Sequence, residues 1–171
     1  MNNNPQIYIA CLASYNNGIL FGTWIDATQS LDIVYQEIQT MLANSPISGA
    51  EEWAIHDYEG FCNYQIDEYE DIQTICEIAE FIVEQGILGI EVMQILNCNV
   101  EQAKEVIANQ YYRAYENELE FAMQLFDDCY GSEIPTALEH YIDYEAFQRD
   151  LFINDYFSLE LDGETRVFSN C

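Results

Sequence analysis

The chain has 171 residues, and half of them are hydrophobic and 14% aromatic, which excludes a disordered acidic tail and predicts folded domains. It carries 31 acidic residues against four Lys and Arg, a formal net charge of -27 at pH 7. A surface of this charge excludes nucleic acid and anionic membranes as partners and favours basic proteins or cations.

The few basic residues are confined to the C-terminal part of the chain. Residues 1–103 contain 16 of the acids and no Lys or Arg. Because almost no acid can find a basic partner within the chain, we expect the folded state to carry unneutralised repulsion. The four basic residues are Lys104, Arg113, Arg149 and Arg166.

The first part of the chain predicts a small antiparallel sheet. Residues 6–13 and 19–25 are rich in the β-branched and aromatic side chains that are typical of strands. Asn17 and Gly18 lie between them, and an Asn-Gly pair favours a tight hairpin turn because both residues tolerate positive φ.

One helix should pack on this sheet, and a third strand should complete it. Thr28 or Ser30 can cap the helix, which ends near Pro46, and residues 52–58 alternate as a strand does. The apolar face of the helix consists of Leu31, Val34, Ile38, Met41 and Leu42.

The middle of the chain, residues 62–110, has a helical period throughout. Gly86 and Gly89 should interrupt it, and Asn99 can cap the helix that follows. The helices expected here cover residues 68–84, 90–96 and 100–108. In the first of them, one face gathers Ile72, Ile75, Ile78, Ala79 and Ile82.

The last part, residues 111–171, predicts helices followed by a hairpin. The expected helices run from Tyr111 to about Asp128, from Pro135 to Tyr141, and from Asp143 or Tyr144 to Phe152; the expected strands are residues 156–161 and 165–169, joined by Asp162-Gly163. The fold class is therefore α+β in three small domains, 1–61, 62–110 and 111–171.

A row of carboxylates on the helix at 68–84 is the candidate functional feature. Glu77, Glu80 and Glu84, together with Glu70, fall within roughly 80° of one another, opposite the Ile face. Their axial steps of about 4.5 and 6 Å resemble in scale the phosphate advance of about 3.4 Å along a DNA strand.

The alternative is an acidic surface that only keeps the protein soluble, but a whole chain of this charge favours a function. Glu116 and Glu120 form a like-charged i,i+4 pair, which is unfavourable on a helix. The candidate acidic surface consists of Asp67, Glu68, Glu70, Asp71, Glu77, Glu80, Glu84, Glu91, Glu101, Glu116, Glu120, Asp127 and Asp128.

Metal and catalytic sites are not indicated. Residues 127–132 and 67–71 lack the ligand spacing of a calcium-binding EF-hand loop, and His56 is expected to pack as a strand residue. A nucleophile, base and orienter could be imagined at Cys129, His140 and Asp143, but this order carries no family signature. We therefore predict no catalytic residue, no metal site and no cofactor.

The six cysteines, at positions 11, 62, 76, 98, 129 and 171, form no CxxC motif. We expect reduced and mostly buried thiols. The first residues lack the basic region of a signal peptide, and no apolar stretch is long enough to span a membrane, so a cytoplasmic protein is expected.

Three segments resemble the ArdA family of antirestriction proteins: PQIYIACLASYNNGILFGTWIDAT (5–28), EEWAIHDYEGF (51–61) and LEHYIDYEAFQRDLFINDYFSLE (138–160). The resemblance implies elongated, curved chains of three small domains that pair as homodimers. It implies that surface carboxylates imitate the phosphates of bent DNA and occupy the DNA-binding groove of type I restriction–modification enzymes, so that an incoming plasmid or transposon is protected.

The expected function is therefore a DNA-mimic inhibitor, without cofactor or turnover and hence not an enzyme. A dimer would carry a negative charge equal to that of the phosphates of roughly 27 base pairs. The alternative is an acidic binding module that sequesters or chaperones another basic DNA-binding protein.

A possible dimer interface lies in residues 111–171, because aromatic residues and Arg are enriched at association surfaces. Two acidic chains would repel each other through their more acidic N-terminal parts. The alternative is that the same aromatics fill the core of this part. The residues concerned are Arg113, Arg149, Arg166, Tyr141, Tyr144, Phe147, Phe152, Tyr156 and Phe157.

Overall fold

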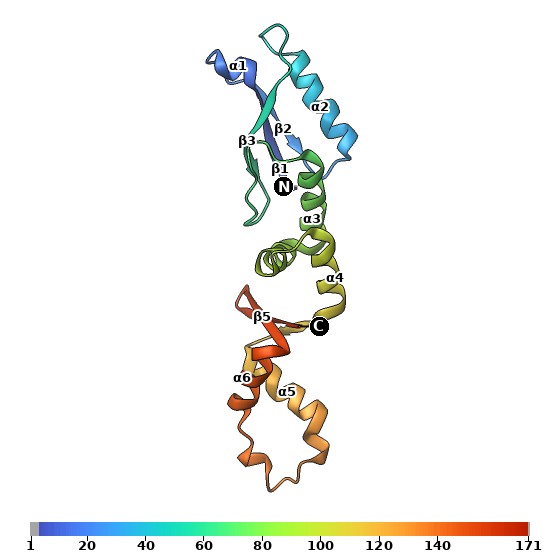
Figure 1. Cartoon of the computed structure of the whole chain (residues 1–171), viewed down its shortest axis with the longest axis vertical. Helices are drawn as coiled ribbons and strands as arrows, with labels where there is room; N and C mark the ends of the chain where they lie inside the picture. The colour runs from blue at the N-terminus through green and yellow to red at the C-terminus, as the bar shows by residue number, and fades with distance from the viewer. Residues whose placement is uncertain (1–3, 171) are drawn as a thin grey trace. The chain divides into compact units, whose positions relative to one another are not determined.

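A computed structural model describes residues 4–170 and confirms the α+β fold class. In this range it contains six α-helices and two three-stranded antiparallel sheets (Figure 1). The chain divides into two compact units, residues 1–100 and 101–171, with the boundary inside helix α4 (Val100–Gln110). The first sheet and the helices that follow it thus share one unit, and the predicted three-domain division at 61 and 110 stays a prediction.

The sheet of the N-terminal unit has the strand order β2-β1-β3, with every pair antiparallel. Its central strand buries Ile7 and Ile9 completely, as expected of alternating side chains that face a core. Helix α2 (Leu31–Ala43) packs on this sheet through Val34, Ile38 and Met41 of the predicted apolar face. The strands are β1 (Gln6–Cys11), β2 (Gly22–Asp26) and β3 (Trp53–Glu59).

The tight hairpin expected at Asn17-Gly18 is wrong. A short helix, α1 (Leu12–Asn16), follows β1, and Gly18 ends it with φ +74°. The Gly18 N–H donates to the carbonyl of Tyr15 at 2.9 Å, and the Ile19 N–H donates to that of Ser14 at 3.0 Å. These two bonds form a Schellman motif, which needs the same left-handed backbone as a hairpin turn and so has the same sequence signal.

Helix α3 (Ile72–Leu96) is divided by Gly86, as predicted. Asp71 caps its start by accepting from the Thr74 N–H at 3.1 Å, and Gly86 has non-helical angles (φ +62°, ψ -152°). Figure 1 shows the two halves running in different directions. Gly89 does not break the helix: a Cβ there would lie 2.7 Å from the Phe81 ring, so its role is close packing. The predicted apolar face of the first half is buried.

The C-terminal unit has the strand order β4-β6-β5 around one aromatic core. Phe121 and Ala122 of α5 and Leu151 of α6 pack there with Tyr115 and Val167. The hairpin at Asp162-Gly163 is confirmed, since both residues have positive φ. The elements are β4 (Tyr111–Tyr115), α5 (Glu118–Tyr130), α6 (Tyr144–Asn154), β5 (Tyr156–Leu161) and β6 (Glu164–Ser169).

Two predicted helices of this unit are wrong. Residues 111–115 form a strand because Tyr111 pairs with Phe168 and Tyr115 with Thr165, and the helix begins only after its cap, Asn117. The segment from Pro135 to Tyr141 contains a 3-10 turn at Glu139–Tyr141 in place of a regular helix. No helix between residues 4 and 170 is long and apolar enough to cross a membrane.

Asp26 is the acid most closely tied to the fold. Its carboxylate accepts hydrogen bonds from the Asn4 amide at 2.9 Å and from the Thr28 N–H and hydroxyl at 2.8 and 2.6 Å. Partial burial opposes its ionisation, but the bonds from Thr28 and Asn4 outweigh burial and lower the pKa below its ordinary value of 3.8. Ionised Asp26 therefore stabilises the fold above that pH, and the contribution is lost as pH falls through the lowered pKa.

We expect Asp26→Asn to lower the free energy of unfolding by about 1–3 kcal/mol at pH 7, because the amide oxygen can keep the bonds from Thr28 but the new NH₂ group cannot accept the bond from the Asn4 amide. The difference from the unsubstituted chain should shrink below pH 3.8, as Asp26 itself becomes protonated. Urea unfolding at pH 7 and at pH 3 measures the difference in unfolding free energy between the two chains at each pH. Asp67→Asn, an exposed acid of the same unit, is the control, and an equal loss there would contradict the prediction.

Candidate functional site

The acids of this protein lie on its surface. All 31 fall between Asp26 and Glu164, within the described residues; 26 are exposed, five are partly buried and none is buried. Of the thirteen acids predicted as a functional surface, eleven are exposed and only Glu70 and Glu91 are partly buried. Eight belong to the N-terminal unit and five to the C-terminal unit, and each group is described on its own.

The N-terminal group is carried by the loop before α3 and by both halves of that helix. Glu70 lies in the loop, so its predicted place in the helical row is wrong. The row consists of Glu77, Glu80 and Glu84, all exposed on the first half and spanning about 10 Å along the axis. Asp67, Glu68, Glu70 and Asp71 precede the helix, and Glu91 lies on its second half.

Several of these carboxylates have a polar side chain as a neighbour. Glu77 accepts from the Gln73 side chain at 2.8 Å, and Glu91 accepts from the Asn63 side chain at 3.0 Å. Glu68 lies 3.9 Å from the Nε2 atom of His56. Amide donors fix the direction of a carboxylate without cancelling its charge, which is what a fixed array of negative charge requires.

The pKa values of neighbouring groups report the negative potential. Burial, followed by Glu80, Asp71 and Glu77, raises the pKa of the Cys76 thiol to about 11. The pKa of Tyr64 is raised by burial and then by Glu70 and Asp67. Carboxylates of the loop before α3 and of its first half therefore both raise the pKa values of nearby side chains.

The C-terminal group contains Glu101 on α4, Glu116 before α5, and three acids on α5. Glu116 precedes the Asn117 cap, so the predicted i,i+4 helical pair with Glu120 is wrong; the Glu120 carboxylate accepts from the Glu116 backbone N–H at 2.6 Å. Asp127 and Asp128 occupy the last turn of α5, where the helix dipole disfavours negative charge. Fold stability therefore does not account for these two acids.

Salt should stabilise this protein. Like charges that repel one another in the native state are screened over about 10 Å at 0.1 M salt. We expect the melting temperature to rise by several degrees between about 0.01 and 0.3 M NaCl. Thermal unfolding followed by circular dichroism measures it, with KCl at matched ionic strength as the control. A flat or falling curve would show that the acids are compensated locally.

Other chemistry finds little support in the described residues. Between residues 4 and 170, no group of three or more His, Cys, Asp or Glu side chains could hold a metal ion. His56 packs edge-on against Tyr15, with ring centroids 4.7 Å apart, as a structural residue does. His140 lies within the 3-10 turn at Glu139–Tyr141, Asp143 caps α6 by accepting from the Ala146 N–H at 3.0 Å, and Cys129 lies near the end of α5.

The expectation of mostly buried thiols is wrong. Cys11 and Cys76 are buried and Cys98 is partly so, but Cys62 and Cys129 are exposed. All five are free, and Cys171 lies outside the described residues.

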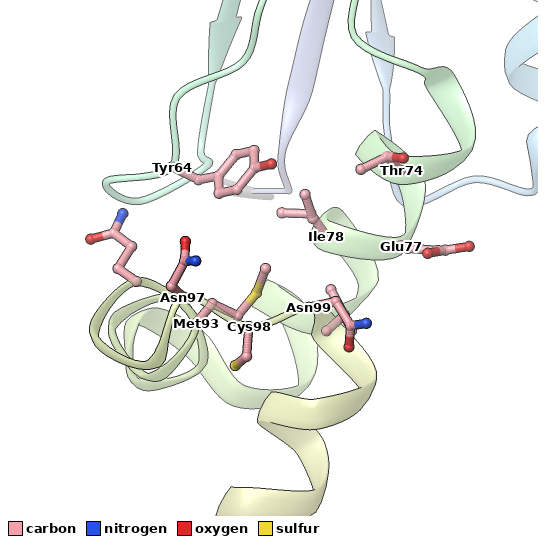
Figure 2. A pocket seen from close by; sticks show the side chains of 10 residues that line it. Tyr64, Thr74, Glu77, Ile78, Met93, Asn97, Cys98 and Asn99 are labelled. Atoms are coloured by element: carbon pink, nitrogen blue, oxygen red, sulfur yellow. The ribbon is translucent and has the colours of Figure 1, made fainter. Parts of the chain in front are cut away.

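A groove of about 480 Å³ lies beside the first half of α3, and the sequence did not reveal it. Figure 2 shows Tyr64 and Asn97 at one end and Glu77 at the other, with Ile78 and Met93 between them. Asn97 has φ +47° and ends α3. The signal in the sequence is Asn97, because Asn tolerates the left-handed backbone that ends the helix there.

Comparison with known proteins identifies the family of this chain. A family model described as "Antirestriction protein (ArdA)" matches residues 7–163 of the 171-residue chain, a range that includes all thirteen acids of the candidate surface. The match confirms the resemblance carried by the three segments at 5–28, 51–61 and 138–160. No curated protein matches the chain.

Proposed function

Since this chain belongs to the ArdA antirestriction family, we propose that it is a DNA mimic that occupies the DNA-binding groove of type I restriction–modification enzymes with its carboxylate surface. Family membership gives the antirestriction role, and with it an interaction with restriction enzymes. One observation supports mimicry above the rest: 31 acids, none of them buried, stand against four basic residues.

The physics of DNA binding explains how such a surface would act. A groove lined with Lys and Arg gains much of its affinity by neutralising phosphates and releasing their counterions. Carboxylates fixed on a folded chain can take the place of those phosphates. Because they offer charge and shape and no base edges, inhibition would not depend on the recognition sequence of the enzyme.

A competition experiment tests this proposal. Purified chain is titrated into a type I enzyme with unmodified duplex DNA, and binding of the DNA is measured at several DNA concentrations. Mimicry predicts that the half-inhibitory concentration rises in proportion to the DNA. Inhibition that excess DNA does not relieve would contradict the proposal. In cells, expression of the chain should raise the plating efficiency of unmodified phage on a restricting host.

The second candidate function is an acidic module for another basic DNA-binding protein, and the unneutralised surface favours it equally. It predicts that the chain binds a histone-like protein and leaves DNA bound to the restriction enzyme. The same competition assay, run with both proteins, separates the two functions.

The chain would act by occupancy alone, with no turnover and no cofactor. It would work in the cytoplasm, where restriction meets incoming DNA, and would be encoded by a mobile element such as a plasmid or transposon that gains from it.

We also propose a homodimer, but the residues that suggested its interface are mostly engaged within the C-terminal unit. Phe147, Phe152 and Tyr156 pack against its core, and Phe157 stacks on Phe168 with centroids 4.9 Å apart. Arg166 lies 2.8 Å from Glu164, Arg149 lies 3.9 Å from Asp150, and Arg113 lies over the Tyr115 ring. Tyr144 contacts Phe126 edge-on. These residues thus support the alternative of an internal core.

Tyr141, 84% exposed, and Leu138, 53% exposed, remain as candidate contacts between two copies. We expect the double substitution Leu138→Ser and Tyr141→Ser to weaken dimerisation at least about tenfold, because aromatic anchors such as Tyr141 dominate such interfaces and Leu138 adds apolar contact area. Sedimentation velocity measures it. Leu20→Ser, an exposed apolar residue of the other unit, is the control. A double variant that stays as dimeric as the unsubstituted chain would move the interface elsewhere.

A further inference from the structure

The groove beside α3 combines an apolar floor with polar ends. Ile78 and Met93 form the floor and are almost fully buried. Glu77, which is exposed, stands at one end, and Asn97 and the half-buried Tyr64 ring stand at the other. Figure 2 shows that these side chains come from three segments: the loop before α3, the first half of α3, and the second half with the turn after it.

This combination matches the chemistry of an arginine side chain. The three methylene groups of arginine pack on apolar surface while its charged end stays at the edge. Its planar guanidinium carries five donors in a fork that can bind one carboxylate through two parallel bonds. Lysine offers a compact ammonium with three donors and gains less from a planar carboxylate.

Residues 1–103 offer no basic side chain for this groove. All ten residues that line the groove belong to the N-terminal unit, and residues 1–103 contain no Lys or Arg. The surroundings are strongly negative, because Asp71, Glu77 and Glu80 all act on the nearby Cys76 thiol. A cationic side chain of a partner is thus the complementary occupant.

We infer that this groove is a socket for an arginine side chain of the partner protein, with the guanidinium on Glu77 and the methylene stem on Ile78 and Met93. The inference rests on the proposed function for the identity of the partner, a basic DNA-binding protein. It goes beyond mimicry, because a row of phosphates has no apolar floor. The stem contact is apolar and adds affinity that salt does not screen.

Arginine binding can be tested without any restriction enzyme. N-acetyl-arginine methylamide is titrated into the full chain, and the methyl NMR signals of Ile78 and Met93 are followed. N-acetyl-lysine methylamide, of equal charge, is the matched probe. We expect saturable shifts at both methyl groups with the arginine probe and an affinity for the lysine probe that is at least about threefold weaker.

Three variants locate the binding. Glu77→Gln keeps the shape of the side chain and should weaken the arginine probe about fivefold. Glu59→Gln removes an exposed acid that does not line the groove and should change the affinity by less than about twofold. Thr74→Trp places a large side chain at the lining and should abolish the shifts, with thermal unfolding as the check on its fold.

The outcomes distinguish the socket from the proposed function. Equal affinity for the two probes, or equal effects of the Glu77 and Glu59 substitutions, would overturn the socket in favour of general attraction to an acidic surface. A chain that competes with DNA but binds no arginine probe overturns the socket alone. A chain that binds the probe at Ile78 and Met93 but does not displace DNA from the enzyme supports the socket and overturns the proposed function.

Discussion

Replacing Glu77, Glu80 and Glu84 together by Gln is expected to weaken inhibition of a type I enzyme by at least about tenfold, whereas each single replacement changes it by less than about fivefold. The three carboxylates are exposed on one half of α3. One exposed charge pair contributes little to affinity. Removing three neighbouring charges from one row leaves the facing Lys and Arg side chains of the enzyme without anionic partners.

The measurement is the half-inhibitory concentration against a fixed amount of duplex DNA, repeated at several salt concentrations. Since each neutralised contact contributes to the salt dependence, the triple variant should also show a shallower slope of log affinity against log salt. The matched control replaces Glu51, Glu52 and Glu59, three exposed acids of the same unit, by Gln. An equal loss in the control would mean that net charge alone matters. Loss of all inhibition on a single substitution, in a chain that still folds, would indicate a discrete binding site.

The second large effect concerns Phe121, the centre of the C-terminal core. Its ring is fully buried and contacts four other rings edge-on, with centroid distances from 4.8 to 5.8 Å, those of Tyr112, Tyr115, Phe152 and Tyr156. Phe121→Ala should cost about 3–5 kcal/mol, which is comparable to the whole stability of a unit this small. We therefore expect residues 101–171 to unfold while the N-terminal unit stays folded.

Hydrogen exchange shows which unit has unfolded. Amides of β1, around Ile7 and Ile9, should keep their protection in the variant, and those of β6 should lose it. Met123→Ala on the same helix, where the side chain is exposed, serves as the control and should cost less than about 1 kcal/mol. Loss of protection in both units would show that the two fold as one cooperative body.

The sequence predicted the elements that rest on local signals. The spacing of Ile72, Ile75 and Ile78 defines the buried face of α3, and Gly86 divides that helix. Asp162-Gly163 forms the expected hairpin because both residues adopt positive φ. In each case the local preference of the residue matches the conformation or burial that it has in the fold.

The wrong predictions concern segments whose structure depends on a partner far along the chain, or whose sequence signal is common to two structures. Residues 111–115 have a helical pattern but are held as a strand by pairing with β6, some fifty residues later. Gly18 tolerates a left-handed backbone, which suits a hairpin and a helix end alike. Net charge predicted that the acids lie outside, but the groove depends on how the two halves of α3 pack, which no local pattern encodes.

Each unit has an exposed cysteine that a thiol reagent can reach. Cys62 in the N-terminal unit and Cys129 in the C-terminal unit are exposed, while Cys76 is buried with a pKa of about 11 and has almost no thiolate at neutral pH. Since labelling needs access to the sulfur, a maleimide spin label should modify the exposed pair and spare the buried Cys11 and Cys76. With Cys98 and Cys171 replaced by Ser, electron–electron distance measurements could follow the separation of the two units when the chain engages a partner.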